Sequence, residues 1–117
     1  MNDKLATGKL GEDLALRFLL KLGWVEKARN YRYRRSEIDL IMLDEDTLVF
    51  VEVKSRRGLS KFGFPEEAVD DKKAAKVHEG AEQYLEEHQW HGSIRFDIIS
   101  VQLLNSRSEI RHFKDAF

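Results

Sequence analysis

The 117-residue chain has the length of one ordinary domain, and its 42% hydrophobic and 35% charged residues are typical of a soluble globular protein. It lacks cysteine, an N-terminal segment resembling a signal peptide, and any run near the roughly 20 apolar residues that span a membrane. A formal net charge of −1 excludes nucleic-acid binding through overall charge and leaves only local binding. We therefore expect one cytoplasmic domain over 1–117 that has no association with membranes.

The first predicted element is a helix over 7–22. Large apolar residues recur in it at helical spacing: Leu10, Leu14, Phe18 and Leu22. The helix ends at Gly23, a residue typical of positions just past a helix end. Gly11 and Ala15 lie on or beside the same face, so we expect this helix to approach a sheet closely.

The later elements alternate between strands and a second helix. The pattern predicts a short strand near 24–26, a hairpin of strands 36–43 and 47–54, a loop over 56–67, a helix over 70–87 and strands over 93–104 and 109–113. This order predicts an α/β fold in which a central mixed sheet is flanked by helices. The strand after the second helix is expected to run parallel to its neighbour.

The hairpin decides which side chains share a face of the sheet. A loop of two or four residues gives three predicted pairs: Ile41 with Phe50, Asp39 with Glu52, and Glu37 with Lys54. One face then becomes wholly apolar, with Ile38, Leu40, Met42, Val49, Val51 and Val53. A three-residue loop would place Asp39 among valines, so the apolar pattern favours the first register.

On the opposite face, Asp39 and Glu52 are expected to be cross-strand neighbours. Like charges in that position are destabilising without a counter-charge. Mg²⁺ would supply it, since this ion commonly joins one or two carboxylates to a phosphate. Lys54, two residues beyond Glu52, could orient a water or neutralise charge on a phosphate. Alternation alone equally allows solvated charges on an exposed face, with one ion pair between Glu37 and Lys54.

A basic and aromatic stretch over 27–36 precedes these carboxylates. Arginine side chains suit bidentate phosphate contacts, which position a duplex without reading its sequence. The candidates for such contacts are Arg32, Arg34, Arg35 and, after the second strand, Arg56. Alternatively, these basic residues are simply solvent-exposed side chains where a strand begins.

The order of Asp39, a turn, and Glu52-Val53-Lys54 resembles the D…(D/E)-x-K signature of the PD-(D/E)XK nuclease superfamily. The whole chain is similar to a small bacterial family of endonuclease-like (YraN-like) proteins related to archaeal Holliday-junction resolvases. The resemblance rests on "GKLGEDLALRFL" (8–19), "ARNYR" (28–32), "EIDLIM" (37–42), "LVFVEVKSR" (48–56), "FGFPEEAV" (62–69), Lys73, "RFDIISV" (95–101) and "DAF" at the end. Ile38 departs from the superfamily's proline, and Ser36 from the glycine usual in the closer family.

The resemblance implies a restriction-endonuclease-like fold and Mg²⁺- or Mn²⁺-dependent cleavage of DNA, in particular of branched or structured DNA. It implies the following roles: Asp39 and Glu52 as metal ligands, Lys54 as the catalytic lysine, Glu12 as an additional acidic residue near the metal, and Lys73 as a phosphate contact. A resolvase-like protein would act as a two-fold homodimer. Two alternatives stay open: a nucleic-acid-binding module with this fold but no significant turnover, and an interaction domain with no nucleic-acid role.

Overall fold

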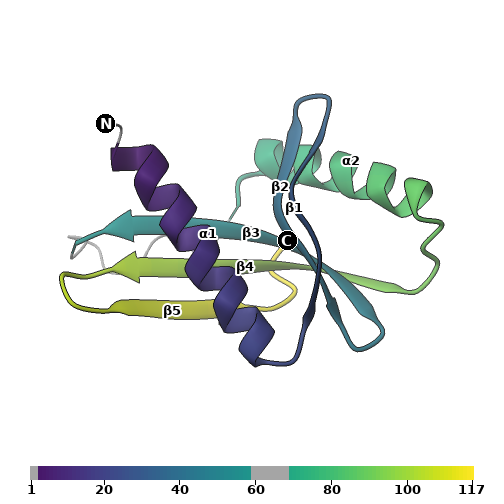
Figure 1. The fold of residues 1–117 in the computed structure, drawn as a ribbon. Coiled ribbons are helices and arrows are strands. Elements are labelled where there is room, and N and C mark those ends of the chain that lie inside the picture. Colours follow the sequence, from purple (N-terminus) through teal and green to yellow (C-terminus); the bar gives the residue numbers. More distant parts are fainter. Residues whose placement is uncertain (1–2, 59–68) are drawn as a thin grey trace.

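A five-stranded sheet carries one helix on each face in the computed structural model, which describes residues 3–58 and 69–117 (Figure 1). Its elements are α1 (Asp3–Lys21), β1 (Val25–Tyr33), β2 (Ser36–Asp44), β3 (Thr47–Arg57), α2 (Asp71–Glu87), β4 (Ser93–Leu103) and β5 (Ser108–Phe113). The strands lie in the order β1-β2-β3-β4-β5. Only β3 and β4 are parallel among these neighbours. The α/β prediction of a mixed sheet flanked by helices is confirmed and is consistent with a restriction-endonuclease-like fold.

Two strands are longer than the sequence predicts. β1 takes in most of the basic stretch instead of stopping near residue 26, and β3 continues to Arg57. The predicted loop over 56–67 therefore begins later, and its residues from 59 onward lie outside the described part of the chain. α1 begins at Asp3, ahead of the predicted start.

The two faces of β2 and β3 pack into separate cores. The α1 side contains Leu40, Met42, Val49 and Val51, and the α2 side contains Ile41, Leu48 and Phe50. Ile41 lies opposite Phe50, so the predicted hairpin register is confirmed. Ile38 packs on the α2 side, and its predicted placement on the same face as Leu40 is wrong. The alternation is broken where the pairing of β2 with β3 ends, at Leu40, and there Asp39 accepts from the backbone N–H of Val53.

Small side chains bring α1 against the sheet, where it packs mainly on β3 and β4. Its buried seam is Thr7, Gly11, Ala15 and Leu19. The predicted apolar face with Leu10, Leu14, Phe18 and Leu22 is partly wrong, since Leu10 and Leu22 are 40% and 51% exposed. A Cβ atom at Gly11 would overlap the Ser55 hydroxyl, so only glycine lets the helix lie this close to β3.

On the other face, α2 packs against the β1–β2 hairpin. Apolar residues at helical spacing predict a buried seam on this helix: Ala74, Val77, Ala81, Tyr84 and Leu85. The buried residues are Val77, Gly80, Ala81 and Tyr84, so most of that seam is confirmed. Ser36, at the start of β2, lies close to Gly80, and its hydroxyl donates to the carbonyl of Lys76. The serine thus joins the hairpin to α2. Neither of the two helices described is long and apolar enough to cross a membrane.

The first part of β2, from Ser36 to Asp39, lies apart from β3. The paired register of these strands ends at Leu40 and Val51, whereas β1 and β2 remain paired to the end of their hairpin. Figure 1 shows this hairpin bending away from β3 beside α2. Glu37 consequently lies opposite Arg32 of β1, and its predicted pairing with Lys54 is wrong.

Candidate active site

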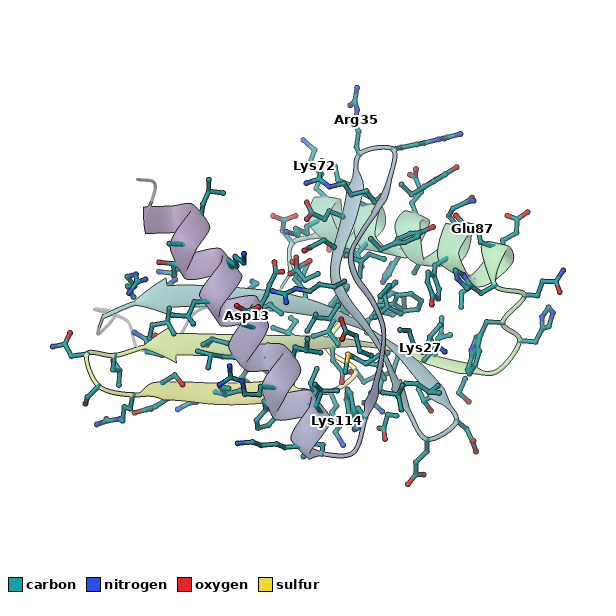
Figure 2. The ribbon with its side chains drawn as sticks, viewed as in Figure 1. Asp13, Lys27, Arg35, Lys72, Glu87 and Lys114 are labelled. Carbon is teal, nitrogen blue, oxygen red and sulfur yellow. The ribbon has the colours of Figure 1, made fainter. Side chains whose placement is uncertain are left out.

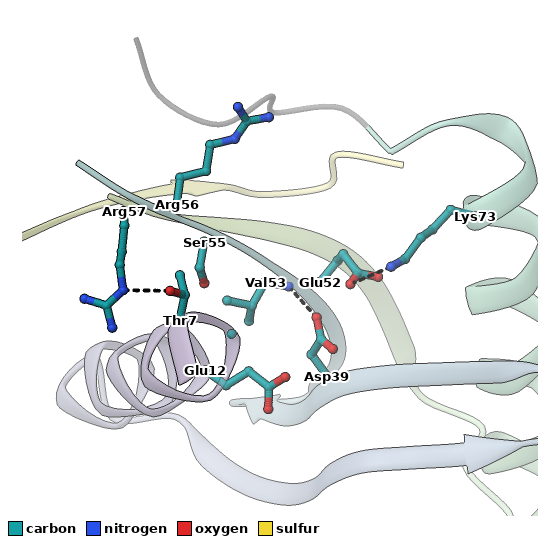
Figure 3. Close-up of a pocket in the computed structure, with 10 residues that line it drawn as sticks. Thr7, Glu12, Asp39, Glu52, Val53, Ser55, Arg56, Arg57 and Lys73 are labelled. Atoms are coloured by element: carbon teal, nitrogen blue, oxygen red, sulfur yellow. Dashed lines mark hydrogen bonds and ion pairs between the residues drawn. The ribbon is translucent and has the colours of Figure 1, made fainter. Parts of the chain in front are cut away.

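An open cleft of about 950 Å³ lies where β2 and β3 separate. Its lining comes from α1, β2, β3 and α2, as Figure 3 shows. The charged residues in that lining are Glu12, Asp39, Glu52, Arg56, Arg57 and Lys73. The fold therefore places three carboxylates from three different elements beside three cationic side chains.

Asp39 is the carboxylate placed by the separation of the strands. Its Oδ2 accepts a hydrogen bond from the backbone N–H of Val53 at 2.8 Å. The N–H of Val53 thus finds a side-chain acceptor where the backbone pairing of β2 with β3 has ended. Burial, and then the neighbouring Glu52, raise the pKa of Asp39 to about 8. Below that pH the folded protein therefore keeps a proton on Asp39, and ionising this side chain costs stability.

Glu52 is the most buried carboxylate of the cleft. Its side chain is 5% exposed, and its Oε1 lies 3.3 Å from Nζ of Lys73. Its Oε2 is buried and accepts no hydrogen bond within the described residues. A buried carboxylate oxygen without a partner is costly, and a bound cation would remove that cost.

Glu12 reaches the cleft from α1 and is held by β1. Asn30 Nδ2 donates to Glu12 Oε1 at 3.0 Å, and Arg29 Nε lies 3.4 Å from the same oxygen. Burial raises the pKa of Glu12, although the hydrogen bond from Asn30 opposes the shift. In Figure 3 the carboxylates of Glu12, Asp39 and Glu52 follow one another across the cleft.

Sequence reasoning did not single out Asn30 or Thr7. Asn30 has a φ of 53°, which is uncommon for a residue within a strand. It lies opposite Asp39 of β2, between the pairs Arg29–Leu40 and Tyr31–Ile38. Thr7 Oγ1 accepts from Nε of Arg57 at 2.8 Å, which fixes this arginine at the edge of the cleft. The "ARNYR" segment of the resemblance contained Asn30, but its part in holding Glu12 depends on how α1 meets β1.

Asp39 and Glu52 fit a divalent cation. They offer hard oxygen ligands, one of which is buried and unpartnered. No group of three or more His, Cys, Asp or Glu side chains arranged to hold a metal occurs within 3–58 and 69–117. Mg²⁺ is commonly bound by one or two carboxylates, with waters and phosphate oxygens completing its shell. Asp39 and Glu52 would therefore hold the ion together with water and substrate.

The two predicted lysines lie differently. Lys73, from the first turn of α2, lines the cleft and contacts Glu52. Lys54 is half-buried on β3, two residues from Glu52, and the described lining of the cleft does not include it. Within the described lining of the cleft, Lys73 is thus the lysine that contacts Glu52.

Of the predicted arginines, only Arg56 lines the carboxylate cleft. Arg32 lines a neighbouring cleft of about 470 Å³ that shares Glu12 with the first, and it lies 3.4 Å from Glu37. Arg34 lies in the β1–β2 turn with its guanidinium over the ring of Tyr33. Figure 2 shows Arg35 at the tip of the same hairpin. The arginines thus extend outward from the carboxylates along the hairpin.

The carboxylate pair should make the metal-free protein less stable as the pH rises. The folded-state pKa of Asp39 is about 8 against an ordinary value of 3.8, so between these values the folded chain keeps a proton that the unfolded chain releases. We expect Asp39→Asn to raise the free energy of unfolding by about 1–3 kcal/mol at pH 8 and far less at pH 5.

Urea unfolding in EDTA at both pH values measures this difference. Asp46→Asn is the matched control, since it removes the same charge from the exposed β2–β3 turn. A variant Asp39→Asn that is less stable than the wild type at pH 8 would contradict the assigned repulsion.

Comparisons with known proteins place this chain among similar bacterial sequences. A family model described as "Uncharacterised protein family UPF0102" matches residues 11–101. A UPF0102 protein of Rhodococcus opacus is 43% identical over 119 residues, and one of Alkaliphilus oremlandii is 42% identical over 122. A third, from Clostridioides difficile, is 42% identical over 118 residues. In all three, the alignment covers 100% of both chains.

Proposed function

The chain belongs to the UPF0102 family, and from that premise we propose that it is a divalent-cation-dependent endonuclease that hydrolyses phosphodiesters of branched or structured DNA. One observation carries the proposal. Asp39 and the buried, unpartnered oxygen of Glu52 lie together in an open cleft whose other charged side chains include arginines and a lysine. The resemblance to PD-(D/E)XK nucleases in the Asp39 and Glu52-Val53-Lys54 pattern supports the same reaction.

In the proposed mechanism, Asp39 and Glu52 would hold Mg²⁺ or Mn²⁺ in the cleft. When bound, such an ion lowers the pKa of a water and stabilises charge on a phosphoryl group. Arg56 and Lys73 bind phosphate oxygens and orient the backbone for attack. The water gives a proton to Glu12 and forms a new P–O bond, the ester P–O bond breaks, and the leaving oxygen takes a proton from solvent.

Glu12 and Lys54 have supporting roles in this proposal. Glu12 lies close enough for Asp39 to affect its protonation, so it is suited to hold a water or take its proton. Lys54 is the lysine of the signature and would act from the same strand face as Glu52.

A second candidate is a nucleic-acid-binding module of the same family that does not cleave. The arginines favour it, because they extend along the hairpin away from the carboxylates and suit contacts that position a duplex without cleaving it. The basic hairpin would still contact the DNA backbone, and such contacts weaken as salt rises.

A panel of DNA substrates tests the proposal. Purified protein is incubated with duplex, single-stranded, flap and four-way DNA in Mg²⁺ or Mn²⁺, and in EDTA as control. We expect salt-sensitive binding, and cleavage of branched DNA that EDTA abolishes. Protein that retards branched DNA but leaves it intact in Mn²⁺ supports the binding module, whereas a lack of any salt-sensitive binding contradicts both candidates.

A further inference from the structure

The ion pair between Lys73 and Glu52 is unlike an ordinary surface pair. Glu52 is 5% exposed, whereas 55% of the Lys73 side chain is exposed, and their charged atoms are 3.3 Å apart. The lysine uses only Oε1, and Oε2 stays without a partner within the described residues. The carboxylate is thus fixed and incompletely neutralised, while its cationic partner has room to move.

The backbone of Lys73 is anchored although its side chain is not. Asp70 caps α2, and its Oδ1 accepts from the N–H of Lys73 at 2.8 Å. The side chain therefore extends from a fixed point on α2 toward the carboxylates, as Figure 3 shows. Rotation about its four-carbon stem can move the ammonium without any change in the fold.

A divalent ion and this ammonium would compete for the same carboxylate. Mg²⁺ binds oxygen at about 2.0–2.1 Å, so an ion between Asp39 and Glu52 would lie close to the present position of Nζ. Like charges at such a separation repel strongly in a partly buried site. The ammonium also acts on Asp39, whose pKa it lowers against the larger effects of burial and Glu52.

We propose that Lys73 is an internal counter-cation, which a divalent ion displaces from Glu52 and which is thereby released to bind a substrate phosphate. This inference rests on the proposed function of the cleft. It makes metal binding and phosphate binding cooperate, because the lysine becomes available only after the metal has taken its place. It also places a positive charge beside the Asp39–Glu52 pair of the metal-free protein.

The test is Mn²⁺ binding by isothermal titration calorimetry in the absence of DNA. Lys73→Met removes the competing charge and keeps most of the side-chain length, and Lys72→Met is the matched control from the same exposed turn (Figure 2). We expect Lys73→Met to bind Mn²⁺ about two- to tenfold more tightly than Lys72→Met, because a half-exposed ammonium no longer competes. Lys73→Gln should behave in the same way.

Thermal unfolding supplies a second measurement. In EDTA, Lys73→Met should unfold at a lower temperature than Lys72→Met, and saturating Mn²⁺ should remove the difference. If the wild type binds Mn²⁺ and Lys73→Met binds it equally or more weakly than Lys72→Met, the inference is overturned and the proposed function stands. If the wild type binds no Mn²⁺, both are overturned.

Discussion

Replacing Glu52 by glutamine should abolish DNA cleavage while leaving the fold intact. Glutamine keeps the size of the side chain but removes the charge of the most buried carboxylate in the cleft, 5% exposed in the structure. We expect cleavage in Mn²⁺ to fall by about 10²- to 10³-fold or more, the loss typical when a group that stabilises transition-state charge is removed.

The measurement is the initial rate of four-way DNA cleavage at saturating Mn²⁺, with circular dichroism to verify folding. Glu82→Gln is the control, because it changes the net charge equally from an exposed position on α2. DNA binding in EDTA should survive Glu52→Gln, since the basic side chains that contact the backbone remain. Cleavage that persists in Glu52→Gln would refute the assignment of this cleft as the active site.

The largest effect on stability should come from Asp97, which belongs to a second polar cluster outside the cleft. Its side chain is fully buried, and its oxygens contact Arg95 at 2.8 Å, His112 at 2.7 Å and the N–H of Asp115 at 3.0 Å. Asp97→Ala would leave these donors without their acceptor. We expect the free energy of unfolding to fall by about 3–5 kcal/mol, the range for breaking one side of a buried pair.

Urea unfolding at pH 7 measures this loss, and Asp44→Ala is the control. Asp44 contacts the same Arg95 at 3.4 Å but is 25% exposed, so its removal should cost about 0–1 kcal/mol. Equal losses in the two variants would contradict the central position given to Asp97.

The contribution of Asp97 should also depend on pH. Against the cost of burial, hydrogen bonds from His112 and Arg95 hold the pKa of Asp97 below its ordinary value of 3.8. The unfolded chain therefore binds this proton first as the pH falls, and stability decreases below that value. The wild type should lose stability in acid more steeply than Asp97→Ala.

The parts of the fold that follow local patterns could be predicted from the sequence. The pairing of Ile41 with Phe50 follows from two alternating apolar strands and a short polar turn. The seam of α2 follows from apolar residues at helical spacing, and the parallel pairing of β3 and β4 follows from the intervening helix.

Features that depend on contacts between distant segments could not be predicted. The close approach of α1 at Gly11 was expected, but no spacing in the sequence shows that the residue it meets is Ser55 of β3. Ile38 changes face where the pairing of β2 with β3 ends, and no spacing within β2 indicates that end. The contact of Lys73 with Glu52 joins α2 to β3, and no spacing within either element indicates it.

The separation of β2 from β3 has a consequence for solubility. Beyond Val51, the edge of β3 facing β2 has no strand partner among the described residues, and such edges are templates for pairing with other chains and for aggregation. Asp39 occupies the N–H of Val53, and the exposed Arg56 and Arg57 place like charges along the next residues. Two copies that approached each other by this edge would bring these arginines together, so their charge opposes pairing of the open edge with a second chain.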